Sequence, residues 1–527
     1  SAPSSSAPLD VSLSAMSSLT AIGRLGTFPN GRNGLSMSTT SCNVGTGNIP
    51  WFAPMDIRHP VIALNLYRVS NGRFEQVGWS WLKHGFLSTN SNGCGTCQSP
   101  GTGTLLGVNC SDTYGTGNNS DRNYLGGRDE VNAFTGVWTC TNSYFSNYQN
   151  DCVRRNNGSE FGSDPVAHRL EVLDADLGNA GATYYYEAYY ISANDFDKYN
   201  NVGSRGASMV WNSGTNRWDI TTTSAQVQGP AVNRWGEMRG TAVPRTEGDV
   251  IVAVQTTNLG SGMYRYEYAV YNHDLDRQIR EFSVPLPNGS TVQNVGFRDI
   301  DQNTGNQWSN VVASNKITWS TGTFGVGTPN PLKYSSTFNF RFDCNVQPVN
   351  SLATLGLFKP GTGTQLTAAT KAPLMLQPVS SFALDNGFQF AGNLASMTSS
   401  DNNRLELGPT NEGSRSGTGI TTSMTGPAGA VTELIVGVES NNTLNPTPGG
   451  TQTIQLWNWT TSSWELLNSR PVTQADSLAV IAVTSNPGRF IQTTSREVRS
   501  RIVHVAAVGE TGNRWRMNFD MVGIQFN

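Results

Sequence analysis

The sequence contains few charged residues. Asp, Glu, Lys and Arg make up 14% of its 527 residues, whereas about 25% is usual, so long helices with charged faces are not expected. The 35 basic and 38 acidic residues leave a formal net charge of −3, which argues against nucleic acid as a partner. The longest apolar runs, at residues 434–438 and 478–483, are far shorter than the roughly 18 residues of a membrane-crossing helix. No membrane span is expected.

Histidine is also scarce, with five residues, and two common catalytic motifs are missing. The sequence has no Gly-x-Ser-x-Gly motif, which excludes the usual nucleophile turn of the α/β-hydrolases. It has no glycine-rich loop followed by Lys and Ser or Thr, which excludes a P-loop nucleotide site. Composition alone therefore names no reaction.

Short β-rich runs separated by turn residues fill most of the chain. Examples are residues 61–69, 74–82, 184–191, 250–255 and 264–272, and eight further runs lie between residues 388 and 526. Such runs, without a sustained 3.6-residue period, are typical of all-β folds. The prediction is an all-β protein with a large N-terminal β-sandwich-like domain, which carries a long disulfide-stapled loop insertion, and a C-terminal β-sandwich or jelly-roll domain.

Changes in composition place the domain boundaries. The predicted parts are an extended N-terminal arm (residues 1–50), a β-rich domain (51–345) with a Cys-rich loop (94–162), a Pro/Gly-rich linker (346–364) and a β-sandwich domain (365–527). An arm of this kind can lie on a neighbouring subunit. Self-association through the arm is therefore one expectation.

Cysteines gather in the N-terminal half of the chain. Five of the seven lie within 59 residues rich in Gly, Asn, Ser and Thr, namely Cys94, Cys97, Cys110, Cys140 and Cys152. Loops that bury little apolar surface need covalent staples, so these cysteines are expected to form disulfides. A zinc site or a redox pair at the Cys94-Gly-Thr-Cys97 motif is the alternative. The odd count leaves one thiol over.

The beginning of the sequence and its cysteines indicate the same compartment. The chain starts with Ser1 rather than Met, as expected after removal of a secretory signal peptide. Disulfides persist in oxidising surroundings. A secreted, extracellular or cell-surface location is therefore predicted.

Two tyrosine-rich runs carry glutamates. Alternate residues of a strand share a face, so Glu187 is expected between Tyr185 and Tyr189, an arrangement that suits a sugar ring. Glu267 lies in a similar run at residues 264–268. If these strands were neighbours, Glu187 and Glu267 could form the paired carboxylates of a glycosidase. The alternative is cross-strand stacking and an ion pair on a sheet face.

One Asp-x-Asp pair has the composition of a calcium loop. Asp299 and Asp301 are followed by Asn303, and such oxygen ligands suit a hard cation, although the next glycine comes one position late for an EF-hand. Calcium is the one cofactor that the sequence suggests. Solvated or turn-capping aspartates are the alternative.

Three of the five histidines fall in the first predicted domain. His59, His84 and His168 border apolar or strand-like segments, and converging imidazoles would form a transition-metal site with an open position. Their spacing does not require convergence. Structural histidines are the alternative.

A predicted hairpin in the C-terminal domain carries three tryptophans. Trp457, Trp459 and Trp464 lie near its tip. Exposed rings would form a platform for a polysaccharide, whereas buried rings would belong to the core of the sandwich.

Several longer strings resemble one group of proteins. They are GWSWLKHGF (residues 78–86), CGTC (94–97), CSDTY (110–114), RDEVNA (128–133), YRYEYAVYN (264–272) and FSVPLP (282–287). They resemble motifs of large, uncharacterised β-rich proteins secreted by planctomycete-type bacteria, over residues 51–345 and more weakly in the C-terminal domain. The resemblance implies an extracytoplasmic bacterial protein. The group has no assigned activity, so it implies no catalytic residue.

Three functions fit these features. The low charge, the arm, the tandem β domains and the odd cysteine favour a secreted structural or cell-surface protein that assembles into a filament, matrix or surface layer. A glycan-binding or adhesive protein is the first alternative. A secreted hydrolase or metal-dependent enzyme is the second, although a non-catalytic role is favoured over an enzyme.

Overall fold

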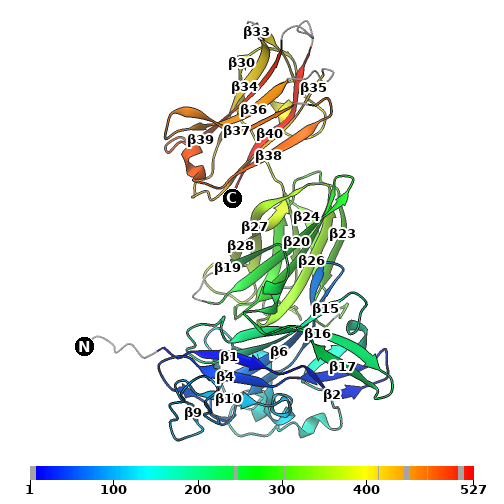
Figure 1. Cartoon of the computed structure of the whole chain (residues 1–527), viewed down its shortest axis with the longest axis vertical. Coiled ribbons are helices and arrows are strands. Elements are labelled where there is room, and N and C mark those ends of the chain that lie inside the picture. Colours follow the sequence, from blue (N-terminus) through cyan, green and yellow to red (C-terminus); the bar gives the residue numbers. More distant parts are fainter. Residues whose placement is uncertain are drawn as a thin grey trace, which may run out of the picture. The chain divides into compact units, whose positions relative to one another are not determined.

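The structure, a computed structural model, describes residues 8–242, 247–301, 303–412, 415–443, 450–471, 473–507 and 515–527. The chain divides into two compact units, Ser1–Pro373 and Leu374–Asn527. Strands dominate both units, and the single α-helix among the described residues, α1 (Thr116–Asn119), has four residues (Figure 1). The all-β prediction is confirmed. No helix in the described ranges has the length and apolar character to span a membrane.

The N-terminal part of the first unit is built on one large sheet. Its strands follow the order β17 (Arg217–Thr222), β16 (Val202–Asn212), β15 (Thr183–Ile191), β6 (Val61–Ser70), β7 (Arg73–Trp79), β14 (Leu170–Leu173), β3 (Arg32–Ser36) and β2 (Thr20–Leu25), with β8 (Leu82–His84), β11 (Leu125–Gly126) and β18 (Val227–Gln228) paired at its margins. A second sheet contains β1 (Val11–Met16), β4 (Thr39–Asn43) and β10 (Ser111–Tyr114). Apolar residues of both sheets share one core.

The prediction of an extended arm over residues 1–50 is corrected by the structure. Its described residues form β1 to β4 and the short β5 (Ile49–Pro50), which pair within the chain's own sheets, in blue in Figure 1. Val11 and Leu13 alternate with serines and are fully buried, so this Ser-rich segment has a strand pattern that is too short to raise its overall hydrophobicity. Residues 1–7 lie outside the described residues.

The Cys-rich loop is an insertion of short elements held by disulfides. It contains β9 (Leu105–Leu106), β10, α1, β11, β12 (Val131–Asn132), β13 (Val137–Trp138) and the 3-10 helices η1 (Arg122–Tyr124), η2 (Arg128–Glu130), η3 (Tyr144–Ser146) and η4 (Ser159–Phe161). The disulfides join Cys97 to Cys110, Cys140 to Cys152, and Cys94 to Cys42 on β4. The stapled insertion is as predicted. Cys344 is the buried free thiol.

These three disulfides are consistent with an extracellular protein. Disulfides form and persist in oxidising compartments and are rare where thiols are kept reduced.

The rest of the first unit is a two-sheet sandwich. One sheet follows the order β19 (Met238–Ala242), β20 (Val250–Gly260), β21 (Met263–Asn272), β26 (Ser336–Cys344) and β23 (Val292–Arg298), and the other β24 (Ser309–Ala313), β25 (Lys316–Ser320), β22 (Ile279–Pro285), β27 (Pro348–Leu357) and β28 (Gln365–Pro373). A third apolar cluster, which includes Tyr67, Phe74 and Tyr271, joins this sandwich to the large sheet. The first unit therefore contains two β-sheet assemblies, the part built on the large sheet and the sandwich, which share an apolar contact.

The prediction of a linker at residues 346–364 is also corrected by the structure. Most of it forms β27 and the turn into β28, and the division between the compact units follows Pro373 instead. Pro348 and Pro373 lie opposite each other at the ends of the paired strands. Proline is tolerated at strand ends, so these prolines end a hairpin and do not mark a linker.

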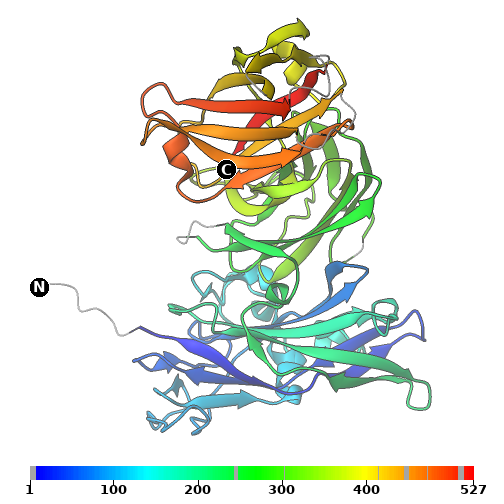
Figure 2. The ribbon, with the colours of Figure 1, turned by 45° about the horizontal axis from the view of Figure 1, so that its top comes forward.

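The second unit is a sandwich of two six-stranded sheets, which confirms the predicted C-terminal fold (Figure 2). One sheet contains β31 (Phe388–Ala391), β32 (Leu405–Gly408), β40 (Met517–Phe526), β35 (Leu434–Asn442), β38 (Ser477–Val483) and β29 (Gln377–Pro378). The other contains β30 (Ser381–Asn386), β34 (Arg415–Thr425), β39 (Glu497–Ala507), β36 (Thr451–Asn458), β37 (Ser463–Pro471) and β33 (Thr410–Glu412). The remaining short 3-10 helices of the chain are η5 (Asp174–Asp176), η6 (Ala231–Arg234), η7 (Leu394–Met397) and η8 (Pro487–Phe490).

Candidate functional site

A cavity in the first unit, of about 350 Å³, combines aromatic rings with carboxylates. We call it the aromatic pocket. Its lining residues come from β7, η2, the Cys140–Cys152 loop, the segment after β23 and the start of β26: Trp79, Trp81, Gly127, Arg128, Asp129, Glu130, Tyr148, Asp299, Ile300, Asp301, Asn330, Pro331, Lys333, Ser336 and Phe338.

The end of β7 and the short segment before β8 each supply one tryptophan to this pocket. Trp79 is the last residue of β7 and is 37% exposed. The guanidinium of Arg128 lies 5.2 Å from the centre of its ring, a cation-π contact that fixes the ring. Trp81 packs edge-on against Tyr144, with ring centres 4.9 Å apart. Both indoles are therefore held while part of their surface faces the pocket.

A disulfide-closed turn supplies the third ring. Tyr148 lies between Cys140 and Cys152 and is 61% exposed. Asn147 and Tyr148 have φ values of 55° and 57°, the left-handed region, which reverses the chain directly after η3. The staple thus presents a large aromatic side chain to the pocket on a constrained turn.

Four acidic residues and one lysine add polar groups. Asp129 and Lys333 form an ion pair of 2.7 Å, and both are substantially exposed. Asp299 is buried and accepts a hydrogen bond of 2.6 Å from Asn330. Glu130 accepts hydrogen bonds from the backbone N–H of Tyr144 at 2.6 Å and from the indole of Trp138 at 3.5 Å. The pocket can both accept and donate hydrogen bonds.

Burial raises the pKa of Glu130 to about 7, and the neighbouring charge of Asp129 acts in the same direction. Because the folded-state pKa exceeds the ordinary value of 4.5, protonated Glu130 stabilises the fold at low pH, and that contribution is lost as the pH rises from about 4.5 to about 7. A Glu130→Gln variant stays neutral, so we expect its advantage in melting temperature over the wild type to grow between pH 5 and pH 8. Thermal unfolding of both proteins at the two pH values measures this, and a difference that is independent of pH would contradict it.

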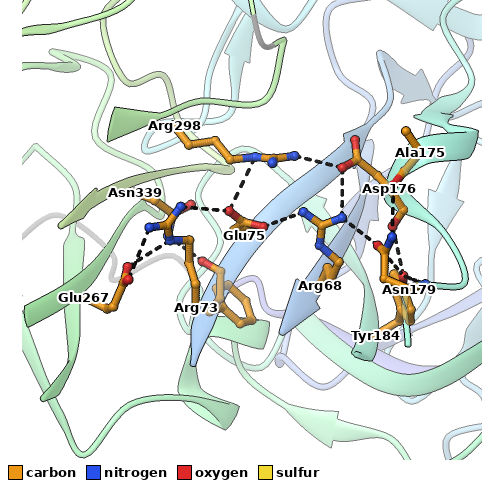
Figure 3. Close-up of polar contacts among 11 residues, drawn as sticks. Arg68, Arg73, Glu75, Ala175, Asp176, Asn179, Tyr184, Glu267, Arg298 and Asn339 are labelled. Carbon is orange, nitrogen blue, oxygen red and sulfur yellow. Dashed lines mark hydrogen bonds and ion pairs between the residues drawn. The ribbon is translucent and has the colours of Figure 1, made fainter. Parts of the chain in front are cut away.

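An ion-pair network joins β7 to β23 (Figure 3). Glu75 on β7 contacts three arginines: Arg68 at 2.6 Å, Arg73 at 3.3 Å and Arg298 at 3.7 Å. Arg68 and Arg298 each also bind Asp176 at 3.0 Å, and Arg73 binds Glu267 at 2.9 Å. β7 ends at Trp79, and Arg298 directly precedes Asp299, so the network fixes two walls of the pocket against each other.

The glutamates predicted as a glycosidase pair have separate structural partners. Glu187 is fully buried and accepts hydrogen bonds from Asn65 at 2.8 Å, Tyr67 at 3.0 Å and the backbone N–H of Ala231 at 2.6 Å. Glu267 is held by Arg73. Neither glutamate lines the aromatic pocket. β15 and β21 belong to different sheets, so the condition for a glycosidase pair, that the two strands are neighbours, is not met.

The tyrosines flanking Glu187 do not form an exposed platform. Tyr189 is buried, and its ring stacks on His273 at a centre distance of 4.8 Å. Tyr185 is half-buried, with the guanidinium of Arg234 5.2 Å from its ring centre. The face of β15 that carries them is covered by other parts of the first unit, which the sequence pattern could not show.

The three histidines do not gather into one site. Nε2 of His59 lies 2.5 Å from Nδ1 of His84, whereas His168 packs on Trp81 with ring centres 3.5 Å apart. Burial lowers the pKa of His59 and of His168 to about 4. In the described ranges, no group of three or more His, Cys, Asp or Glu residues is arranged to hold a metal ion. The positions agree with structural histidines.

Two of the three residues of the predicted calcium loop, Asp299 and Asp301, line the aromatic pocket, and Asn303 does not. Asp301 accepts hydrogen bonds from the backbone N–H of Asn303 at 2.9 Å and from the side chain of Asn306 at 3.0 Å, which is a turn-capping role. Calcium at this loop stays a prediction.

The three tryptophans of the second unit form a cluster on the β36–β37 hairpin. Trp457 pairs with Trp464 across the strands, and all three rings are half-buried. Trp457 meets Trp459 and Trp464 at interplanar angles of 79° and 75°. Rings packed edge to face offer no common flat surface, so this cluster does not form a side-by-side platform.

The motif strings contained the pocket residues without assigning them a role. Trp79 and Trp81 lie in GWSWLKHGF, and Arg128, Asp129 and Glu130 in RDEVNA. The signal was the Trp-x-Trp spacing, which places two indoles on one side of an extended segment. Tyr148 carried no sequence signal, because its position depends on the Cys140–Cys152 pairing.

Comparisons with known proteins give weak likenesses. No family model matches the chain, and no curated protein matches it in sequence. Similar solved structures include SGBP-B from a complex xyloglucan utilization locus in Bacteroides uniformis, with 8% identity over 97% of this chain and 100% of that chain and a TM-score of 0.19. The N-terminal domain of a Streptococcus gordonii adhesin is similar with 7% identity over 66% of this chain and 77% of that chain, at a TM-score of 0.14. An exo-beta-1,3-galactanase from Phanerochaete chrysosporium is similar with 10% identity over 65% of this chain and 93% of that chain, at a TM-score of 0.13. TM-scores this low support no conclusion about function.

Proposed function

We propose that the chain is an extracellular carbohydrate-binding protein and that the aromatic pocket is its binding site. The observation that carries the proposal is the meeting of Trp79, Trp81 and Tyr148 with exposed carboxylates around one cavity. Large aromatic side chains that remain partly exposed and are held by packing are typical of binding sites.

The chemistry of the pocket suits a sugar. An aromatic face packs against the C–H face of a sugar ring, whereas the hydroxyl groups at the ring edge need hydrogen-bond partners. Asp129 and Asp301 are exposed acceptors, and Lys333 is a donor. A sugar can hydrogen-bond to these groups in place of water, whereas an apolar ligand would displace that water without replacing its hydrogen bonds, at a cost in affinity.

The size of the cavity favours a short saccharide. Its volume of about 350 Å³ lies near the lower end of the roughly 300–1,000 Å³ that small-ligand sites occupy. A chain end or a short branch fits such a cavity better than a long stretch of polymer.

Self-assembly stays a prediction. The arm that suggested it forms, from residue 8 onward, strands within the chain's own sheets. A hydrolytic role has one feature in its favour, because Glu130 has a pKa of about 7, which suits a general acid.

The binding test uses an array of neutral polysaccharides, followed by affinity gel electrophoresis on those that bind. We expect Trp79→Ala and Trp81→Ala each to weaken binding at least tenfold, which corresponds to about 1.4 kcal/mol, because each removes a stacking face. Phe196→Ala is the matched control, since Phe196 is 75% exposed in the same unit and lies outside the pocket.

Two results would overturn this proposal. One is a wild-type protein that binds no polysaccharide of the array, and the other is binding that survives both tryptophan substitutions. Release of sugar by the wild type that Glu130→Gln abolishes would instead assign the pocket to a hydrolase.

A further inference from the structure

Three arginines in and just after the Cys-rich loop form no close ion pair. Arg122, Arg154 and Arg169 form no ion pair with any carboxylate of the described residues, unlike their neighbour Arg155, which binds Asp151 at 2.6 Å. The charge of Asp164 acts on Arg122 and Arg169, and that of Asp121 on Arg169, without a close ion pair.

Backbone carbonyls hold these guanidinium groups in place. Arg122 donates to the carbonyl of Asp164 at 2.6 Å, and Arg169 donates to the carbonyls of Ser120 at 3.0 Å and Pro165 at 2.7 Å. Arg154 donates to the carbonyl of Asn123. The carbonyls accept hydrogen bonds from some guanidinium N–H groups without neutralising their charge. The cations are therefore held in place and can still bind an anion.

The arginines line two adjoining hollows of about 720 and about 380 Å³, which share Asp121, Asn123 and Asn157. The first also contains Arg122 and Arg169, and the second Arg154 and Arg155. Among the described residues that line them, Asp121 is the one acid, and its carboxylate caps η1 by accepting hydrogen bonds from Asn123. We call the two hollows the arginine groove. Asn118, Asn157, Ser120 and Ser159 add uncharged groups that can bind hydroxyls.

The arginine groove and the aromatic pocket flank the same ring. The centre of Phe161 lies 5.8 Å from the guanidinium of Arg122 and 6.4 Å from the ring of Trp81. Trp81 lines the pocket and Arg122 lines the groove. A single polymer could therefore reach from one to the other.

We propose that the arginine groove binds the acidic groups, carboxylate or sulfate ester, of a polysaccharide. Guanidinium forks match the planar or tetrahedral oxyanions of these groups, and the amides and hydroxyls around them match sugar hydroxyls. The inference rests on the proposed carbohydrate-binding function and narrows its ligand class to acidic polysaccharides. A long nucleic acid needs a far more extensive basic surface than three arginines.

The test compares affinity gel electrophoresis of the full chain in polygalacturonate, dextran sulfate and neutral dextran. We expect retardation in one or both acidic gels, weaker at high salt, and at least a fivefold loss of affinity in Arg122→Gln and in Arg154→Gln. Arg154 is exposed, so that variant should fold, and Arg122→Lys keeps the charge and should retain more affinity than Arg122→Gln. Arg217→Gln is the matched control, because Arg217 is exposed, forms no ion pair with a described residue and lies outside the groove.

Three outcomes would overturn the inference: equal retardation in dextran, an equal loss in Arg217→Gln, or equally tight, arginine-dependent binding of duplex DNA. Binding to acidic gels that Arg154→Gln weakens and Trp81→Ala does not would support the groove and contradict the pocket. Binding that depends on the tryptophans but does not favour acidic over neutral polysaccharides would support the pocket and contradict the groove.

Discussion

Replacing Glu75 with glutamine is expected to destabilise the first unit by about 3 to 5 kcal/mol, the cost of removing one partner from a buried ion pair. Glu75 is 5% exposed and contacts three arginines. Glutamine has nearly the same shape but leaves those guanidinium groups without their shared carboxylate. Because β7 and β23 are both fixed by this network, saccharide binding at the aromatic pocket should fall as well.

The pH dependence of the wild type follows from the same group. Burial opposes ionisation of Glu75, but the charges of Arg298 and Arg68 outweigh it and keep the pKa below the ordinary value of 4.5. Its contribution to stability is therefore fully present above pH 4.5 and is lost as the pH falls through the lowered pKa. Glu75→Gln should show a smaller loss of stability over that acidic range.

Calorimetric unfolding at pH 7 and pH 4 measures both effects. Glu281→Gln is the control, since Glu281 and Lys316 form a solvent-exposed pair of 3.9 Å in the same unit, and its loss should cost less than about 1 kcal/mol. A Glu75→Gln protein that melts like Glu281→Gln would show that the network contributes no stability.

The sequence allowed the fold class to be predicted because strand periodicity is local. Tyr184, Tyr186 and Tyr190 point into the core, and Tyr185, Glu187 and Tyr189 lie on the other face of β15, in agreement with the alternation. What covers the second face depends on residues far away in the chain. Glu187 is bound by Asn65 and Ala231, and no local pattern links residues so far apart.

The errors at the N-terminus and at the linker have related causes. Serine and threonine lower the mean hydropathy of β1 and β4, although Val11 and Leu13 still bury fully. Pro348 lies in the predicted linker, but a proline at the end of a strand is compatible with pairing. In both segments the composition is typical of irregular structure, although the residues form strands.

The candidate site was harder to predict, because it is assembled from five segments. Trp79 and Trp81 come from the end of β7 and the short segment after it, whereas Tyr148 depends on a disulfide and Asp299 on a distant strand. The arginine groove is a similar case, since the hydrogen bonds of Arg122 and Arg169 to carbonyls rather than carboxylates are a property of the tertiary structure.

Arg128→Met is expected to have the second large effect, on stability and binding together. Arg128 is 5% exposed and donates to the carbonyls of Ser80 at 2.6 Å, Ser335 at 2.9 Å and Leu64 at 3.1 Å. It also donates to Oδ1 of Asn65 at 3.0 Å. Methionine fills the space but removes this donor from the carbonyls of Ser80 and Ser335, at roughly 1 to 3 kcal/mol for each one that water cannot reach. The carbonyl of Leu64 and Oδ1 of Asn65 keep a second donor, the backbone N–H of Ser80 and the side chain of Gln76.

The effect on binding follows from the position of Arg128 under the pocket. Its guanidinium supports the ring of Trp79, and its partner Asn65 donates in turn to Glu187, so the buried glutamate that resembled a catalytic residue helps to hold the floor of the binding site. Arg128→Lys keeps one charge but cannot reach four acceptors, so its melting temperature and saccharide affinity should fall between those of the wild type and Arg128→Met. Thermal unfolding and affinity electrophoresis measure both quantities. If Arg128→Met instead melts and binds like the wild type, the buried guanidinium supports neither the fold nor the pocket.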